Sequence, residues 1–250
     1  MATKPPQINH LPLNGVDKII AIASGKGGVG KSTTTVMLAH ALAAQGQAIS
    51  ILDADIYGPS IPKMLGLKGQ PELEEGLMIP PKNHSIACNS MGFLLPEDAA
   101  AVWRGPMVTK ALAKLARGTK WNSAKMLVDF PPGTGDVQLS MAQQVPLNGV
   151  ILVTTPQAMA LADARRAADM FQKVNIPILG VIENMSWFED EAGYKHYLFG
   201  QGGGQQLADE LKVPLLAQIP QLPALVGLMD AGQQPNGDAI SLYNSLLNCV

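Results

Sequence analysis

The chain has 250 residues, a formal net charge of −2, a hydrophobic content of 47% and an aromatic content of only 5%. That length allows one large domain or two small ones around an aliphatic core, and the near-neutral charge excludes general nucleic-acid binding driven by charge. Two cysteines, far apart in the sequence, exclude a disulfide framework and fit a reducing compartment.

The first fifteen residues lack the apolar core of a secretion signal, and no stretch reaches the roughly 18 apolar residues that a membrane-spanning helix needs. We therefore expect a cytoplasmic protein. Residues 1–17 are interpreted as an N-terminal extension and residues 18–250 as a single domain.

Apolar runs alternate with helical patterns along that domain. Strands are predicted over 18–24, 47–55, 125–133, 149–156, 176–184 and 213–220, and helices over 31–45, 157–174 and 205–211. The apolar runs are nearly continuous, which is typical of strands covered on both faces. We therefore predict an α/β fold with a doubly wound, mostly parallel sheet. An insertion over 66–95 is predicted to add a small β-hairpin at a sheet edge.

A phosphate-binding loop follows the first predicted strand. The pattern G-x-x-x-x-G-K-[ST] is met by Gly25, Lys26, Gly27, Gly28, Val29, Gly30, Lys31 and Ser32, and Thr33 is next in the helix. Glycines allow the backbone N–H groups to wrap around phosphate oxygens, and the positive end of the helix dipole points at the same anion. Lys31 would bind the β- and γ-phosphates, and the Ser32 hydroxyl would bind Mg²⁺. A flexible turn is the alternative, but the flanking strand and helix favour nucleotide binding.

Acidic residues end two of the predicted strands. Asp53 and Asp55 end the second strand at alternate positions, so both carboxylates can face the loop. Two carboxylates this close repel each other, so both remain charged only at a cost in free energy unless a cation or a reaction uses them. Asp129 closes the apolar run of the third strand, which is the Walker B arrangement, and it is expected to hold Mg²⁺ partly through water.

A switch-like turn follows Asp129. Gly133 and Gly135 would let backbone N–H groups approach a γ-phosphate and respond to its loss, and Asp136 ends the motif. Asn184 and Pro220 end the fifth and sixth strands, where ligands bind in open α/β sheets. We expect Asn184 to pair with the edge of adenine and Pro220 to pack on its face.

Lys26 distinguishes this loop from an ordinary P-loop, which needs only the lysine at its end. The sequence G-K-G-G-V-G-K-S resembles the deviant Walker A loop of the MinD/ParA/Mrp class. The resemblance implies that Lys26 reaches the nucleotide of a partner subunit in a homodimer, in the manner of an arginine finger. It also implies that Asp55 positions the attacking water and that Asp53 lies near Mg²⁺. The alternatives are a solvent-facing Lys26 and an Asp55 that only caps the next turn.

The whole domain resembles the Mrp/ApbC family of P-loop ATPases. The motifs that carry the resemblance, in chain order, are GKGGVGKST, DADIYGPS, WRGPMV, VDFPPGTGD, TTPQAMALADARRA, ENMSWF and YLFGQGGGQQLA. The resemblance implies a homodimeric ATPase that carries or assembles iron–sulfur clusters, including a [4Fe-4S] cluster, for client apoproteins.

The chain departs from that family where a C-x-x-C motif is usual, between ENMS and FG. Residues 187–198 hold no cysteine there. Thiolates are the usual cluster ligands. Cys88 lies in a strand pattern and is predicted to be a small core residue, and Cys249 is expected at a frayed chain end. A protein that uses ATP to act on a partner without holding a cluster is therefore a second hypothesis.

A positioning or partitioning ATPase of the MinD/ParA type is a third hypothesis. The last basic residue is Lys212, so the C-terminal tail cannot supply a basic amphipathic membrane helix. The segment from Arg104 to Lys125 has six basic and no acidic residues, with Lys110, Lys114 and Arg117 on one helical face. We interpret that face as a solvated surface or a docking site for an acidic partner, with nucleic acid less favoured.

Overall fold

The computed structural model describes residues 12–94 and 105–250. Its main sheet has eight strands in the order β12-β9-β8-β1-β7-β2-β6-β5. All neighbouring strands are parallel except β5, which pairs antiparallel with β6 at one edge. The strands are β1 (Lys18–Ala23), β2 (Ile49–Asp53), β5 (Lys82–Asn83), β6 (Ile86–Ser90), β7 (Lys125–Asp129), β8 (Gly149–Thr154), β9 (Ile178–Asn184) and β12 (Leu215–Ile219).

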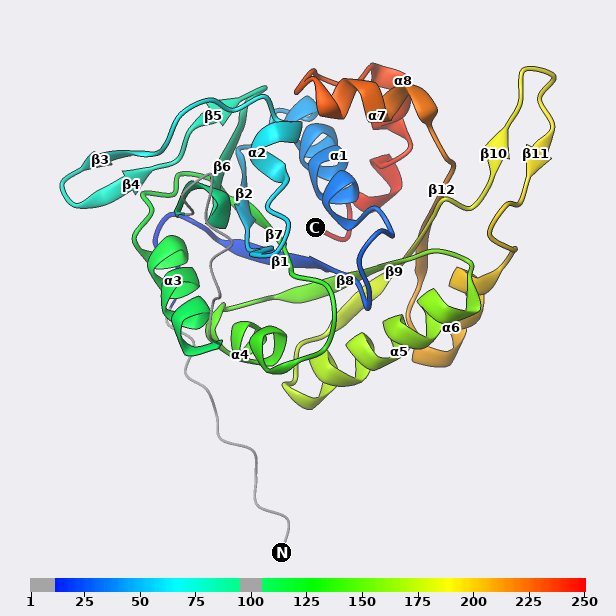
Figure 1. Cartoon of the computed structure of the whole chain (residues 1–250), viewed down its shortest axis with the longest axis horizontal. Coiled ribbons are helices and arrows are strands. Elements are labelled where there is room, and N and C mark those ends of the chain that lie inside the picture. Colours follow the sequence, from blue (N-terminus) through cyan, green and yellow to red (C-terminus); the bar gives the residue numbers. More distant parts are fainter. Residues whose placement is uncertain (1–11, 95–104) are drawn as a thin grey trace, which may run out of the picture.

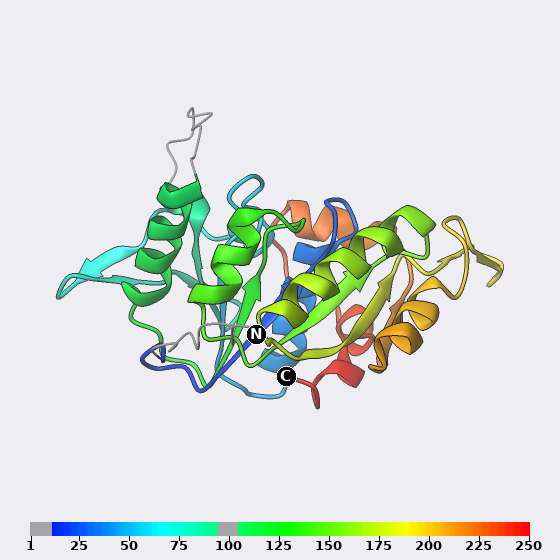
Figure 2. The ribbon, with the colours of Figure 1, turned by 90° about the horizontal axis from the view of Figure 1, so that it is seen from below.

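Helices cover both faces of the sheet (Figures 1 and 2). One face carries α1 (Lys31–Ala44), α2 (Ile61–Met64), α7 (Pro223–Asp230), α8 (Gly237–Ser241) and the 3-10 turn η2 (Asn244–Leu246). The other carries α3 (Gly105–Arg117), α4 (Asp136–Gln144), α5 (Ala158–Lys173) and α6 (Gly203–Leu211). The prediction of a doubly wound, mostly parallel α/β fold is confirmed.

The core consists of aliphatic layers on the two sides of the sheet. Ile20 and Ile22 of β1 face the layer under α1, whereas Ala21 and Ala23 face the layer over α4 and α5. This alternation explains the continuous apolar runs, because each strand buries both of its faces. In the part of the chain that the structure describes, no helix has the length and apolar character needed to cross a bilayer.

The insertion differs from the prediction of one edge hairpin. β3 (Glu72–Glu74) and β4 (Leu77–Ile79) form a separate antiparallel hairpin that projects from the body, whereas β6 joins the main sheet parallel to β2. A 3-10 turn, η1 (Met91–Leu94), follows β6. The β6 sequence buries Ile86 and Cys88, and burial on a central face favours pairing in the main sheet. A second small hairpin, β10 (Phe188–Glu189) and β11 (Lys195–His196), projects from the body near the β12 edge of the sheet (Figure 1).

Candidate functional site

The glycine-rich loop connects β1 to α1 at the carboxyl ends of the parallel strands. Gly30, directly before α1, has φ +82°, and a Cβ there would lie 2.2 Å from the amide nitrogen of Asn184. A Cβ on Gly25 would lie 2.1 Å from the backbone carbonyl carbon of Asp163 in α5. The loop therefore needs glycine at Gly30 for its left-handed conformation and at Gly25 for close packing on α5.

Two adjoining pockets open beside this loop. A polar pocket of about 210 Å³ is lined by the loop, Lys31, Ser32 and Asp55. An apolar pocket of about 390 Å³ lies beyond it, between the ends of β9 and β12 and helix α7. Both pockets are lined by Gly30, Thr33 and Met64. A charged group and an apolar ring of one ligand can thus be held side by side.

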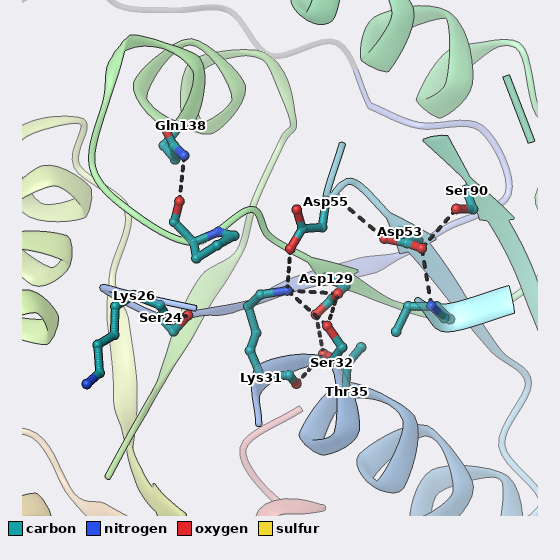
Figure 3. Close-up of polar contacts among 12 residues, drawn as sticks. Ser24, Lys26, Lys31, Ser32, Thr35, Asp53, Asp55, Ser90, Asp129 and Gln138 are labelled. Atoms are coloured by element: carbon teal, nitrogen blue, oxygen red, sulfur yellow. Dashed lines mark hydrogen bonds and ion pairs between the residues drawn. The ribbon is translucent and has the colours of Figure 1, made fainter. Parts of the chain in front are cut away.

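Lys31, Ser32 and Asp129 form the centre of the polar pocket (Figure 3). The Lys31 ammonium nitrogen lies 2.8 Å from Oδ2 of Asp129, and the Ser32 hydroxyl donates to the same oxygen at 2.7 Å. Asp129 is fully buried and ends β7, whereas Lys31 and Ser32 begin α1. The end of β7 therefore faces the start of α1, the helix that follows the neighbouring strand β1. This is the arrangement expected of the Walker A and Walker B positions.

Asp55 lies on the other side of Lys31. Its Oδ2 is 3.4 Å from the Lys31 ammonium nitrogen, and its Oδ1 is buried without a hydrogen-bond partner in the described chain. Burial raises the pKa of Asp55, and the charge of Lys31 opposes that shift. A buried carboxylate oxygen without a described partner, next to Lys31, is available to bind a water molecule or a cation.

Asp53 is directed away from Lys31 toward β6 and α2 (Figure 3). Its Oδ2 accepts a hydrogen bond from the Ser90 hydroxyl at 2.8 Å and from the Ile61 backbone N–H at 3.3 Å. Its Oδ1 accepts from the backbone N–H of Asp55 at 3.3 Å. Complete burial, and then the neighbouring charge of Asp129, raise the pKa of Asp53 to about 8. Asp53 thus fixes the start of α2 and the turn that carries Asp55, and its role near magnesium stays a prediction.

The predicted switch turn lies against the glycine-rich loop. Gly133 has φ +100°, and its backbone N–H donates to the carbonyl of Ser24 at 3.2 Å. Gln138 of α4 donates to the carbonyl of Pro132 at 2.6 Å and so holds the same turn from the other side (Figure 3). Gly135 directly precedes α4, and Asp136 is its first, exposed residue. The turn therefore connects the loop to α4.

Asn184 and Pro220 both line the apolar pocket, as the strand ends predicted. The Asn184 side-chain amide donates to the backbone carbonyl of Val29 at 2.9 Å. Asn184 therefore also fixes the glycine-rich loop to the end of β9, a contact that the sequence did not suggest.

Lys26 is half-buried in the same loop, but its side chain points in a different direction from that of Lys31. The Ser24 hydroxyl donates to the backbone carbonyl of Lys26 at 2.9 Å, and the Lys26 side chain extends away from Lys31 and the carboxylates (Figure 3). No ion pair joins Lys26 to a carboxylate within residues 12–94 and 105–250. Its amino group is thus available to a ligand or to another molecule.

The oxygen atoms around Lys31 suit a magnesium ion. Mg²⁺ prefers carboxylate, hydroxyl and water oxygens. Ser32 Oγ and Asp129 Oδ2 lie next to each other, and Asp55 Oδ1 has no hydrogen-bond partner among residues 12–94 and 105–250. We conclude that the residues present fit magnesium bound with a phosphate group.

The cysteines do not form a comparable site. Cys88 is fully buried in β6, and burial raises the pKa of its thiol well above the ordinary value. The β10–β11 hairpin is stabilised by a hydrogen bond between Asp190 and His196 at 2.7 Å and by the Lys195 ammonium, which lies 4.2 Å from the centroid of the Trp187 ring. Among the residues that the structure describes, no group of three or more His, Cys, Asp or Glu is arranged to hold a metal ion.

The chain end is packed, which corrects the expectation of a frayed end around Cys249. Cys249 is half-buried and its backbone N–H donates to the carbonyl of Leu246. Val250 is buried, and the Lys125 ammonium donates to its carbonyl oxygen at 2.6 Å. The tail is held because Tyr243 and Leu246 bury apolar surface in the same core as α1.

The basic face of α3 is exposed. Lys110, Lys114 and Arg117 are all solvent-accessible, whereas Leu112 and Leu115 of the same helix are buried. Lys120, just after the helix, is instead paired with Glu74 of β3 at 3.1 Å. Arg104, the first member of the predicted basic segment, lies outside the described residues. The three cations on α3 therefore form the predicted stripe.

Sequence reasoning missed residues that position the predicted ones. Thr35 donates to Asp129 at 2.9 Å, Ser90 holds Asp53, and Gln138 holds the switch turn. Thr35 had a detectable signal, because it follows Lys31 by four residues and so shares its helix face. Ser90 had none, because it depends on a strand pairing that the sequence did not predict.

Comparisons with known proteins identify the family of this chain. The model of the NUBPL iron-transfer P-loop NTPase family, of the ParA type, matches residues 15–248. The iron–sulfur cluster transfer protein NUBPL of Mus musculus is 49% identical over 242 residues, which are 93% of this chain and 76% of that protein. An iron–sulfur cluster carrier protein of Escherichia coli is 47% identical over 251 residues, which are 97% of this chain and 68% of that protein.

A solved structure with the same fold is known with a nucleotide. A nucleotide-binding protein from Archaeoglobus fulgidus, in complex with ADP, has 34% sequence identity and a TM-score of 0.77. The similarity covers 89% of this chain and 90% of that chain. That protein and this chain share the fold that positions the loop, the strand ends and the two pockets.

Proposed function

Because the chain belongs to the family of NUBPL iron-transfer P-loop NTPases, we propose that it is a magnesium-dependent ATPase that serves iron–sulfur cluster delivery. The observation that carries the proposal is the cluster of buried Lys31 and Asp129 with half-buried Ser32 next to the glycine-rich loop. The apolar pocket next to it offers a site for the adenine base.

The roles of the pocket residues follow from their positions. Backbone N–H groups of the loop and the Lys31 ammonium bind the phosphate chain, while Asn184 and Pro220 enclose the base. Ser32 and Asp129 hold magnesium, which when bound neutralises phosphate charge. Lys31 then exchanges its contact with Asp129 for the phosphates.

Hydrolysis requires a positioned water molecule. Asp55 is the best candidate, since its Oδ1 is buried, without a partner, and on the same pocket wall as Lys31. The backbone of Gly133 and Gly135 would contact the γ-phosphate and transmit its loss to α4. The turn is already connected to the loop through Ser24 and to α4 through Gln138.

We further propose that the ATP-bound protein is a homodimer in which Lys26 completes the partner's site. This assignment is supported by the half-buried position of Lys26 on the wall of the polar pocket, its direction away from Lys31 and its lack of a described ion-pair partner. A cation added in trans stabilises the charge that develops on the transferred phosphoryl group.

The test of the ATPase is hydrolysis by the purified chain with ATP and magnesium, compared with ATP and EDTA. Phosphate release that requires magnesium supports the proposal. Calorimetry without heat of binding for ATP and magnesium would end it.

The link to clusters is proposed from the relatives and not from thiolate ligands in this chain. Cys88 is buried in the core, and the β10–β11 hairpin carries no cysteine. The residues present therefore do not fit a [4Fe-4S] cluster bridged between the hairpins of two subunits. This observation favours a second candidate function, in which the ATP-dependent dimer acts on a partner that holds the cluster. The positioning and partitioning alternative has no comparable support.

Anaerobic reconstitution separates the two candidates. The chain and a Cys88→Ser/Cys249→Ser variant are reconstituted and analysed for iron and sulfide. Stoichiometric cluster in the chain but not in the variant supports carriage, whereas no cluster in either supports action on a cluster-holding partner.

We place both candidates in the cytoplasm, because neither cysteine is paired in a disulfide.

A further inference from the structure

Thr35 is a buried hydroxyl next to the proposed magnesium site. It lies one helical turn after Lys31 in α1 and is fully buried. Its Oγ1 is 2.9 Å from Oδ1 of Asp129 and 3.1 Å from the backbone carbonyl of Lys31. A hydroxyl has one proton, and an ionised carboxylate is the stronger acceptor. Thr35 therefore donates to Asp129.

The two oxygens of Asp129 have different partners. Oδ1 accepts from Thr35, whereas Oδ2 accepts from the Ser32 hydroxyl at 2.7 Å and lies 2.8 Å from the Lys31 ammonium. All three donors belong to α1, so the helix holds both oxygens of the carboxylate. The orientation of the carboxylate plane depends on both oxygens being held.

The partners of Oδ2 are those that a bound nucleotide requires. Lys31 is needed by the phosphates and the Ser32 hydroxyl by magnesium. When those contacts form, Thr35 is the donor from α1 that remains on Asp129. Mutating a group that orients a metal ligand typically costs roughly 10–100-fold in metal affinity or activity.

We propose that Thr35 is a positioning residue that keeps Asp129 oriented so that Oδ2 faces magnesium. This inference rests on the proposed magnesium-dependent nucleotide binding. It concerns the orientation of Asp129 and not a contact of Thr35 with the nucleotide, because Thr35 lines neither pocket.

The neighbouring threonine gives a matched control. Thr34 is on the same helix and equally buried, but its hydroxyl makes no hydrogen bond to Asp129, whose side-chain partners are Lys31, Ser32 and Thr35. Thr34→Val and Thr35→Val thus replace the same atoms at the same depth. Only the second substitution removes a bond to Asp129.

The experiment measures binding of a fluorescent ADP analogue while magnesium is titrated into the purified chain and its variants. We expect Thr35→Val to raise the magnesium concentration at half-saturation about 10-fold, the lower end of the range for partners of metal ligands. Thr35→Ser, which keeps the hydroxyl, restores the wild-type midpoint, and Thr34→Val does not move it. Binding without magnesium, in EDTA, is the same for all four proteins.

Equal midpoints for the wild type and Thr35→Val overturn the inference, and so does an equal shift in Thr34→Val, which would show a packing effect. If Thr35→Val does not fold, Thr35→Ala and Thr34→Ala form the second pair with the same criteria. A wild type that binds the analogue without any response to magnesium instead overturns the proposed function together with this inference. A wild-type response with unchanged variants overturns the inference alone.

Discussion

The ammonium nitrogen of Lys31 lies 2.8 Å from Oδ2 of Asp129, and both side chains are almost completely buried. Removing one partner of this buried pair would leave an uncompensated charge, and in the proposed function the same lysine binds the phosphates of the nucleotide. Binding and folding therefore depend on one charge.

Replacing Lys31 with alanine should affect both properties. The substitution leaves Asp129 and Asp55 buried without their cation, and breaking a buried pair costs about 3–5 kcal/mol of unfolding free energy. Urea denaturation measures that loss, and calorimetry with ATP and magnesium should detect no binding. Lys63→Ala is the control, because Lys63 forms an exposed pair with Asp230 and should cost less than about 1 kcal/mol. Equal losses in the two variants would contradict the prediction.

Replacing Lys26 with alanine should separate binding from hydrolysis. Lys26 forms no described ion pair, so the variant should fold and bind ATP with wild-type affinity. Without the cation supplied in trans, hydrolysis should fall by a factor on the order of 10³ or more, and ATP should no longer produce a dimer. Sedimentation in ATP and phosphate release measure the two effects. A monomeric Lys26→Ala protein that hydrolyses ATP normally would show that Lys26 does not act in trans.

Replacing Asp55 with alanine should trap the ATP state. The variant loses the proposed water-binding carboxylate but keeps the loop, Ser32 and Asp129. We expect ATP binding to persist, a stable dimer in ATP, and a hydrolysis rate lower by a factor of about 10²–10⁴, the usual contribution of an acid–base group. Rapid hydrolysis by the variant would leave Asp55 with the role of a turn cap.

His40 should make the protein sensitive to mild acid. It is buried in α1, neither ring nitrogen has a hydrogen-bond partner in the described chain, and burial followed by the nearby His84 lowers its pKa to about 4. Because the folded pKa lies below the unfolded value of 6.5, the unfolded chain binds the proton more tightly. The stabilisation is present above pH 6.5 and is lost as the pH falls toward 4, by about 3 kcal/mol in total.

Urea unfolding between pH 7 and pH 4 measures this effect. His40→Leu should differ from the wild type by about 3 kcal/mol in the change of unfolding free energy between pH 7 and pH 4, whereas the opposite contribution of Asp53, whose pKa is raised to about 8, is present in both proteins. His196→Gln is the control, because His196 lies half-exposed on the β10–β11 hairpin. An unchanged slope in His40→Leu would show that another group is responsible.

The exposed basic stripe of α3 should bind an acidic protein partner. Reversing Lys110, Lys114 and Arg117 to glutamate should abolish capture of that partner while leaving ATP hydrolysis unchanged, since the stripe lies apart from both pockets. The control reverses Lys68, Lys82 and Lys173, which are exposed but scattered, and so changes the net charge equally. Salt-dependent DNA binding that only the α3 variant loses would favour nucleic acid instead.

The position of the glycine-rich loop was predictable from the sequence because its geometry is local. Lys31, Ser32 and the glycines follow one another in a loop whose conformation depends on few other residues. Asp129 was also predictable, because the ends of parallel strands meet at one edge of the sheet.

Residues whose position depends on distant pairing were harder to predict. Asp53 and Asp55 were expected on one strand with a shared direction, but β2 ends at Asp53, and Ser90 of β6 binds its carboxylate. The sequence 86–90 is short and follows a proline-rich segment, so its parallel pairing with β2 was not visible. Long-range contacts of this kind decide the direction of Asp53, and local patterns do not contain them.

Gly30, Thr33 and Met64 form a common wall between the polar and the apolar pockets. We therefore expect recognition of the purine and recognition of the phosphate chain to be coupled rather than additive in a thermodynamic cycle. Adenosine alone and pyrophosphate alone should each report less than their share of the affinity of the intact nucleotide. A substitution at Met64 would change the affinity for both fragments at once.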